Sequence, residues 1–171
     1  MIVVVMGVCG CGKTTVGRAL ADRLGWRFFD ADDFHPQANV AKMAAGAALT
    51  DEDRVPWLDR LAAEMRAVAR TGQHAVLACS ALKESYRQRI ARGIESADGG
   101  EAFDVRVVYL KGDVETIEPR LALRSGHYMP PSLLASQFAA LEEPVDAVVI
   151  DIRQPAEAQA AQIAASLRAT P

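Results

Sequence analysis

Five short apolar segments recur along the chain, and longer stretches with helical spacing separate them. The segments cover residues 2–6, 26–30, 75–79, 105–110 and 147–150. Each is nearly continuous in apolar character, as strands are when helices cover both faces of a parallel sheet. The pattern therefore predicts a sheet of five parallel strands.

The stretches between these segments carry apolar residues three and four positions apart, which predicts amphipathic helices. Thr50 precedes one of them and Asp53 follows three positions later, an acidic variant of the capping box. The predicted helices cover residues 13–24, 51–70, 84–92, 114–124, 131–141 and 156–167, and residues 93–101 are expected to form an exposed loop. Repeated strand–helix units predict an α/β doubly wound fold.

Composition limits the classes of protein that this chain can represent. Its 171 residues are 50% hydrophobic and 24% charged, as is typical of one globular domain spanning residues 1–171. The net charge of −3 offers no basic excess for nucleic acid. No apolar run suits a membrane span, and the beginning of the chain lacks the features of a signal peptide. We therefore expect a cytoplasmic protein that binds neither nucleic acid nor membranes.

A glycine-rich segment follows the first apolar run and reads Gly7-Val-Cys-Gly-Cys-Gly-Lys-Thr14. It matches the phosphate-binding loop (P-loop) pattern G-x-x-x-x-G-K-[ST], in the expected position between a strand and a helix. Such a loop points backbone N–H groups at phosphate oxygens, beside the positive end of a helix. We expect Lys13 to reach the β- and γ-phosphates of ATP and the Thr14 hydroxyl to bind Mg²⁺. The predicted ATP-binding residues here are Gly7, Val8, Cys9, Gly10, Cys11, Gly12, Lys13, Thr14 and Thr15.

Two of the three cysteines, Cys9 and Cys11, lie inside this loop. One interpretation is that cysteine simply fills positions that require a small residue. The other is redox sensitivity, because a helix N-terminus and a nearby lysine lower the pKa of a thiol. Two cysteines one residue apart do not form a disulfide framework, and no further metal ligand is apparent beside them.

Acidic residues mark the end of the second predicted strand, which continues as Asp30-Ala-Asp32-Asp33. The sequence lacks the Asn-Lys-x-Asp motif with which GTPases recognise guanine. The third predicted strand ends in Cys79-Ser80, without the acid of motor and transporter ATPases. We expect Asp30 to help hold Mg²⁺ and Asp32 to accept a proton from an attacking hydroxyl group, although the reverse order stays open. The alternative is a solvated acidic turn that caps a helix.

Several longer motifs resemble the gluconokinase family of small P-loop kinases. They are Phe29-Asp-Ala-Asp-Asp-Phe-His-Pro36, Leu49-Thr-Asp-Glu-Asp-Arg54-Val-Pro-Trp-Leu58, Cys79-Ser-Ala-Leu-Lys83, Arg120-Leu-x-x-Arg124-x-Gly-His127 and Ser136-Gln-Phe138. The resemblance runs from residue 2 to about residue 155, and it departs from the family at the loop cysteines and at Val55. It implies transfer of the γ-phosphoryl group of ATP to the 6-hydroxyl of D-gluconate. It also implies a small lid near residues 118–131 and a homodimer.

The resemblance assigns roles to residues outside the loop. A polyhydroxy acid needs cations for its carboxylate and polar groups for its hydroxyls. The expected substrate-binding residues are Asp32, His35, Arg54, Lys83, Arg87, His127 and Gln137. Of the lid arginines, Arg120 is expected near the adenine and Arg124 at the phosphates as a catalytic residue beside Lys13 and Asp32. Gln154 and Pro155 resemble the loop that receives the adenine.

Each of these side chains also has an ordinary structural interpretation. A lone arginine or lysine is usually a solvated surface charge, and His35 could instead make a hydrogen bond at the entry to a helix. Two other functions compete with the gluconokinase interpretation. One is a kinase for another small hydroxy acid such as shikimate, and the other is a nucleotide-binding regulator without turnover. The regulator is disfavoured because the lysine, the acid pair and the lid arginines are all present.

Overall fold

A five-stranded parallel sheet forms the centre of the protein, as the apolar pattern predicts. The computed structural model describes residues 1–95, 103–122 and 134–169. The strands are β1 (Ile2–Met6), β2 (Arg27–Asp30), β3 (Ala75–Ala78), β4 (Val105–Lys111) and β5 (Val148–Asp151), in the order β2-β3-β1-β4-β5. All four strand pairs are parallel. The predicted strand ends differ from the observed ones by no more than one residue.

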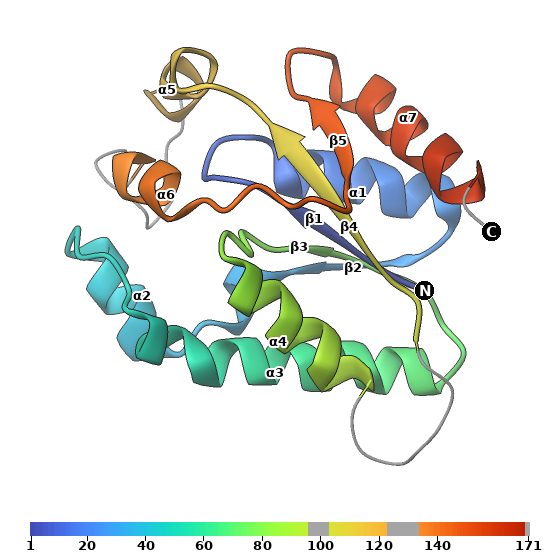
Figure 1. Ribbon diagram of the computed structural model, residues 1–171, viewed down its shortest axis with the longest axis horizontal. Coiled ribbons are helices and arrows are strands. Elements are labelled where there is room, and N and C mark those ends of the chain that lie inside the picture. The colour runs from blue at the N-terminus through green and yellow to red at the C-terminus, as the bar shows by residue number, and fades with distance from the viewer. Residues whose placement is uncertain (96–102, 123–133, 170–171) are drawn as a thin grey trace.

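Helices cover both faces of this sheet, which makes the fold doubly wound (Figure 1). Helices α1 (Lys13–Leu24) and α7 (Ala156–Ala169) pack on one face, and α3 (Asp51–Arg70) and α4 (Glu84–Glu95) pack on the other. Alternate residues of β1 point into the two layers: Val3 and Val5 join the α1–α7 core, and Val4 joins the α3–α4 core. Burial on both sides explains why this strand is apolar throughout.

The predicted capping box starts α3. The Thr50 hydroxyl accepts a hydrogen bond from the Asp53 backbone N–H at 3.2 Å, and the Asp53 carboxylate accepts one from the Thr50 N–H at 2.8 Å. This cap satisfies two of the backbone donors that a helix N-terminus leaves unpaired. Behind it, Leu61 and Met65 are fully buried against the sheet. The cap therefore fixes where the long helix begins beside the carboxyl end of β2.

The structure corrects the prediction at two places. Residues 93–95, predicted to begin a loop, continue α4, because Ile94 is buried on the same helix face as Ile90. The rest of the predicted loop, residues 96–101, lies outside the described residues. A short 3₁₀ helix (Ala31–Phe34) and the helix α2 (Gln37–Ala44) were not predicted. Helix α2 buries only Asn39 and Met43, too few positions to show a helical period.

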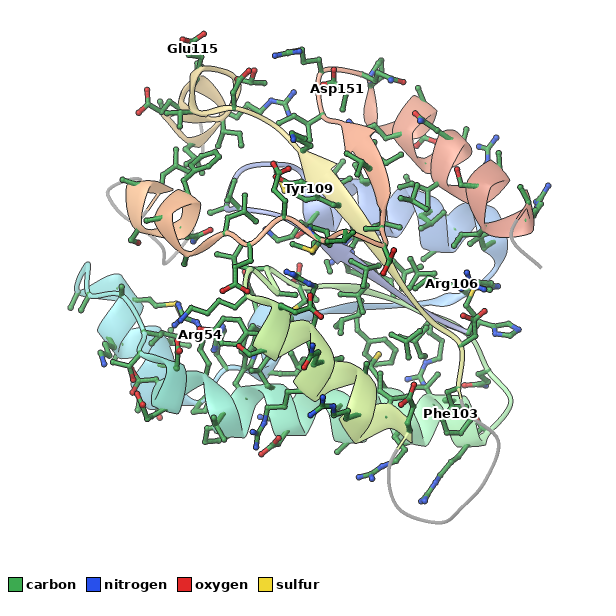
Figure 2. The ribbon with its side chains drawn as sticks, in the orientation of Figure 1. Arg54, Phe103, Arg106, Tyr109, Glu115 and Asp151 are labelled. Atoms are coloured by element: carbon green, nitrogen blue, oxygen red, sulfur yellow. The ribbon has the colours of Figure 1, made fainter. Side chains whose placement is uncertain are left out.

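Two further short helices, α5 (Val114–Ala122) and α6 (Leu134–Ala140), lie near the carboxyl ends of the strands (Figure 1). The predicted helix ends at residues 124 and 131 fall outside the described residues. Within the described ranges, no helix has both the length and the apolar character needed to cross a membrane. Figure 2 shows Arg54 on the side of the molecule that carries α2 and α6, whereas Phe103 and Arg106 lie at the opposite end of the sheet.

Candidate active site

The P-loop connects β1 to α1 at the carboxyl edge of the sheet. Gly10 has φ of 84° and Gly12 has φ of 101°, backbone conformations that glycine adopts without steric cost. A Cβ atom on Gly10 would fall 2.9 Å from the side chain of Leu121 on α5, so the loop also needs glycine there for space. The Lys13 ammonium folds back over the loop and donates to the Val8 carbonyl at 3.0 Å. This is the geometry of a phosphate cradle with its lysine in place.

Asp30 joins the end of β2 to this loop. Its Oδ2 atom accepts a hydrogen bond from the Thr14 hydroxyl at 2.7 Å, and its Oδ1 atom accepts one from the Asp32 backbone N–H at 3.1 Å. The first bond brings together the two residues that the sequence assigns to the metal. A hydroxyl and a carboxylate are hard oxygen donors, which suit Mg²⁺. The donor set therefore fits that ion beside the phosphate cradle.

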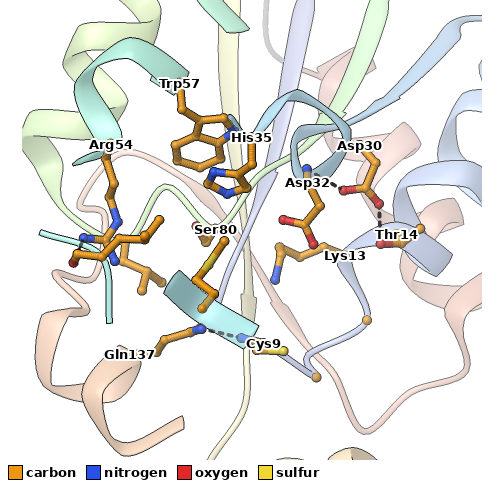
Figure 3. Close-up of a pocket in the computed structure, with 15 residues that line it drawn as sticks. Cys9, Lys13, Thr14, Asp30, Asp32, His35, Arg54, Trp57, Ser80 and Gln137 are labelled. Carbon is orange, nitrogen blue, oxygen red and sulfur yellow. Dashed lines mark hydrogen bonds between the residues drawn. The ribbon is translucent and has the colours of Figure 1, made fainter. Parts of the chain in front are cut away.

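One cleft gathers most of the predicted catalytic and substrate-binding residues (Figure 3). We call it the acceptor cleft. The predicted residues that line it are Cys9, Gly10, Gly12, Lys13, Thr14, Asp30, Asp32, His35, Arg54 and Gln137. Sequence reasoning missed five more lining residues, namely Met43, Leu49, Trp57, Ser80 and Leu82. Leu49, Trp57, Ser80 and Leu82 lie inside the longer motifs but carried no predicted role, because Trp57 reads as a helix-packing residue and Ser80 as the end of a strand.

His35 lies in this cleft as a neutral imidazole. Its ring stacks on that of Trp57 with centroids 4.2 Å apart and an interplanar angle of 11°. Burial lowers the pKa of His35 to about 4, Asp32 opposes this effect and Arg54 adds to it. The His35 Nδ1 atom is buried and has no hydrogen-bond partner within the described chain. The structure does not show the side-chain hydrogen bond of the helix-entry interpretation, so this ring remains a candidate for binding a substrate hydroxyl.

Arg54 and Lys83, the two cationic side chains predicted to bind substrate, differ in position. Arg54 lines the acceptor cleft, donates to the carbonyls of Leu49 and Thr50, and places its guanidinium 5.5 Å from the centre of the Tyr86 ring. Lys83 does not line the cleft and pairs with Asp51, with nitrogen–oxygen distances of 2.7 and 2.8 Å. The hydrogen bond to Asp51 raises the pKa of Lys83. Of these two side chains, Arg54 is therefore the one that lines the acceptor cleft.

Arg87 lies behind the acceptor cleft rather than in it. Only 8% of the residue is exposed, and its Nη1 atom donates to the carbonyls of Ala81 and Leu82 at 2.9 and 3.0 Å. Its Nε and Nη2 atoms pair with the Glu84 carboxylate at 2.9 and 2.7 Å. These contacts give Arg87 a role in holding backbone, which the sequence prediction of a substrate contact did not include.

Gln137 reaches the cleft from α6. Its Oε1 atom accepts a hydrogen bond from the Cys9 backbone N–H at 2.7 Å. A side chain predicted to meet substrate thus contacts the phosphate loop itself. Arg124 and His127 lie outside the described residues, and their predicted roles stay predictions.

A second cleft lies on the other side of the P-loop, where we expect the adenine. Arg120 lines it and donates to the Ile152 carbonyl at 2.9 Å, and Gln154 lines it directly after β5. The sequence missed Gln159 of α7, a buried residue of this cleft whose Nε2 atom donates to the Gln154 carbonyl at 2.7 Å. Pro155 lies between them and its carbonyl accepts from the Gln159 N–H. The residues expected near the adenine are therefore close together, and Gln159 holds the loop of residues 154–155.

The structure contradicts a lowered pKa for Cys11. That side chain is fully buried, and burial raises the pKa of its thiol even though Lys13 acts in the opposite direction. Burial likewise raises the pKa of Cys79 to about 12. Cys11 packs in the core between the sheet and α1, which supports the interpretation that it fills a small space. Cys9 is half-buried and lines the acceptor cleft.

The sheet, the P-loop and the acidic turn beside it define a P-loop kinase. A family model described as an AAA domain matches residues 2–147. A probable gluconokinase of Mus musculus is 47% identical over 152 residues, covering 84% of this chain and 83% of the mouse protein. The chain belongs to the gluconokinase family.

Solved structures agree with this assignment. A sugar kinase from Janibacter sp. HTCC2649 superposes with a TM-score of 0.87 at 44% sequence identity, covering 99% of this chain and 95% of that one. A gluconokinase from Sinorhizobium meliloti 1021 has a TM-score of 0.76 at 38% identity, with coverage of 97% and 94%. The described fold is therefore shared with these kinases over nearly its whole length.

Proposed function

We propose that this protein transfers the γ-phosphoryl group of ATP to the 6-hydroxyl of D-gluconate and releases 6-phospho-D-gluconate. One observation carries the proposal: a single cleft holds the P-loop lysine, the Asp30–Asp32 turn and a cation, Arg54, at its wall. These are the groups needed to bind phosphates, receive a proton and hold a carboxylate. The gluconokinase relatives, which match most of the chain, support the same substrate.

ATP would lie across the P-loop, with its phosphates at the acceptor cleft and its adenine in the second cleft. The loop N–H groups and Lys13 bind the phosphate oxygens, and Arg120 with the 154–155 loop encloses the base. Thr14 and Asp30 would hold Mg²⁺, which when bound neutralises charge on the phosphates. Arg124, on the proposed lid near residues 118–131, adds a further cation, and a closed lid excludes water.

Gluconate would bind with its carboxylate toward Arg54 and its hydroxyls along the cleft. Asp32 is the proposed base, because the Asp30 carboxylate is held by the Thr14 hydroxyl, the other residue of the proposed Mg²⁺ site. It orients the 6-hydroxyl and takes its proton as the phosphoryl group transfers. His35 and Gln137 are proposed hydroxyl contacts. Lys83 and His127 are retained as lesser candidates for the substrate site, whereas Arg87 lies behind the cleft and holds the backbone after β3.

A coupled assay of ADP release tests this proposal directly. We expect release that depends on both Mg²⁺ and D-gluconate and that stays at background with shikimate. ADP release without gluconate, or none with it, would refute the proposed activity. Shikimate-dependent release would instead identify the competing hydroxy-acid kinase. Light scattering on the protein as it elutes from a size-exclusion column tests the proposed homodimer separately.

Asp32→Asn is the sharpest variant for the mechanism. We expect kcat to fall by roughly 10²- to 10⁴-fold, the usual contribution of a general base, while ATP still binds. Asp33→Asn is the matched control, because Asp33 lies in the same acidic turn but is exposed and outside the acceptor cleft. Near-normal turnover in Asp32→Asn would rule out this assignment of the base.

A further inference from the structure

A backbone turn of unusual conformation follows β3 at the acceptor cleft. Ala81 has φ of 41°, and within the described ranges it is the only residue other than glycine with positive φ. It is completely buried. Such backbone is sterically costly for a residue with a Cβ, persists only where its surroundings enforce it, and concentrates at functional sites. Its neighbours on both sides, Ser80 and Leu82, line the acceptor cleft.

Arg87 enforces this conformation from behind. One terminal nitrogen of its buried guanidinium donates to the carbonyls of both Ala81 and Leu82, and the rest of the fork pairs with Glu84. Because both carbonyls bind one rigid planar group, the turn between them is held in a fixed shape. A lysine at this position would keep the charge but lose the fork.

Two more contacts fix the turn relative to the phosphate loop. The Ser80 carbonyl accepts from the Gly7 N–H at 3.4 Å, and the Leu82 carbonyl accepts from the Glu142 N–H at 2.9 Å. The strand order also matters, because β3 lies between β2 and β1. The carboxyl end of β3 is therefore flanked by the Asp30–Asp32 turn on one side and the P-loop on the other.

The Ser80 hydroxyl faces this space. It lines the acceptor cleft and is not fully buried. It makes no side-chain hydrogen bond within the part of the chain that the structure describes. Figure 3 shows Ser80 with Arg54 on one side and Lys13 and Asp32 on the other. It therefore lies between the proposed carboxylate site and the site of phosphoryl transfer. A hydroxyl both donates and accepts, which suits the hydroxyl groups of a sugar acid.

We propose that Ser80 is a specificity-determining residue that hydrogen-bonds one hydroxyl on the carbon chain of the bound sugar acid. Arg87 is then a positioning residue that fixes the place of Ser80 through the Ala81 turn. The inference rests on the proposed function and names a further contact in its acceptor site. It also explains why a buried arginine is placed behind the cleft instead of in it.

Ser80→Ala is the first test, with Ser85→Ala as the matched control. Ser85 is exposed on α4 and outside the acceptor cleft. Loss of one neutral hydrogen bond should raise KM for D-gluconate about two- to tenfold in Ser80→Ala. KM for ATP and the thermal midpoint should stay at the wild-type values, and Ser85→Ala should match wild type throughout. An unchanged gluconate KM in Ser80→Ala would overturn the contact.

Monodeoxy analogues of gluconate identify the hydroxyl that Ser80 binds. For one analogue, the KM of wild type should be higher than its KM for gluconate. The KM of Ser80→Ala should be the same for that analogue as for gluconate. Equal losses in both enzymes for every analogue would show that Ser80 contacts no hydroxyl. If wild type uses a different acceptor acid, the proposed function fails, and the same comparison with that acid still decides the role of Ser80.

Arg87→Lys tests the positioning role. We expect KM for gluconate to rise at least as much as in Ser80→Ala, with little change in KM for ATP. The double variant Ser80→Ala/Arg87→Lys should be no worse than Arg87→Lys alone, because the serine contact is already lost when the turn shifts. A general loss of structure would lower the thermal midpoint and raise both KM values together. Additive effects of the two substitutions, or an unchanged gluconate KM in Arg87→Lys, would refute the positioning role.

Discussion

Protonation of His35 should destabilise the folded protein in a defined pH range. In the unfolded chain this imidazole takes a proton below its ordinary pKa of 6.5, whereas burial against Trp57 lowers the folded pKa to about 4. The unfolded state therefore binds more protons between these two values. The free energy of unfolding must therefore fall as the pH drops from about 6.5 to about 4. Above this range His35 is neutral in both the folded and the unfolded state, so this loss of stability is absent.

The magnitude follows from the difference between the two pKa values. At about 1.4 kcal/mol for each unit of difference in pKa, the loss is at most about 3.5 kcal/mol. The ring is only partly buried, so solvent screening reduces the expected loss to about 2 kcal/mol. Arg54 and Asp32, the charged groups that affect this ring, act in opposite directions on its pKa. Burial is therefore the dominant cause.

Urea unfolding of wild type and His35→Gln between pH 7.5 and pH 4 measures this loss. Wild type should lose about 2 kcal/mol more than His35→Gln across that range. His74→Gln, which removes an exposed imidazole, is the control for the loss of a histidine. NMR titration offers a direct check, because the chain has only three histidines. Parallel pH curves for wild type and His35→Gln, or a His35 midpoint near 6.5, would refute the reasoning.

Three other expected outcomes test the core, the loop and the cysteines. Leu61→Ala should lower the free energy of unfolding by about 3 kcal/mol in urea, because the fully buried side chain leaves a cavity. Gly10→Ala should abolish nucleotide binding measured by calorimetry, since its Cβ would fall 2.9 Å from a leucine of α5. A thiol reagent should modify the native protein at Cys9 alone among the cysteines, and Cys11 and Cys79 should react only after unfolding. Rapid modification of Cys11 in the native protein would contradict its burial.

The sheet could be predicted from the sequence because burial on both faces leaves a direct mark. A strand such as β1 has no polar position to interrupt it, so its limits are visible in the sequence. Helix α3 was equally visible, since twenty residues with a cap give several repeats of the helical period. Helix α2 has eight residues and two buried ones, and its neighbour Ala31–Phe34 is a single turn. Tertiary packing, rather than a local pattern, defines both of these elements.

The site was predictable where one short segment carries the chemistry. The P-loop is such a segment, and the Thr14–Asp30 hydrogen bond joins two residues that were assigned to the same ion. The burial of Cys11 could not be predicted, because the loop packs that side chain inward while leaving Cys9 at the cleft. A lysine and a helix N-terminus were visible in the sequence, but the desolvation that outweighs them was not.

The order β2-β3-β1 also divides the chemistry among neighbouring strand ends. The end of β1 supplies the phosphate cradle, the end of β2 supplies the acid pair, and the turn after β3 supplies Ser80 between them. Arg54 and Trp57 complete the wall from the first turns of α3, which the sheet does not constrain directly. Side-chain substitutions at Ser80 or at the start of α3, which leave the backbone bond between Ser80 and Gly7 in place, should therefore alter the binding of the acceptor without moving the phosphate cradle. If the two sites are separable in this way, such variants should change KM for the sugar acid while KM for ATP stays constant, and a parallel rise in both would show that they are not.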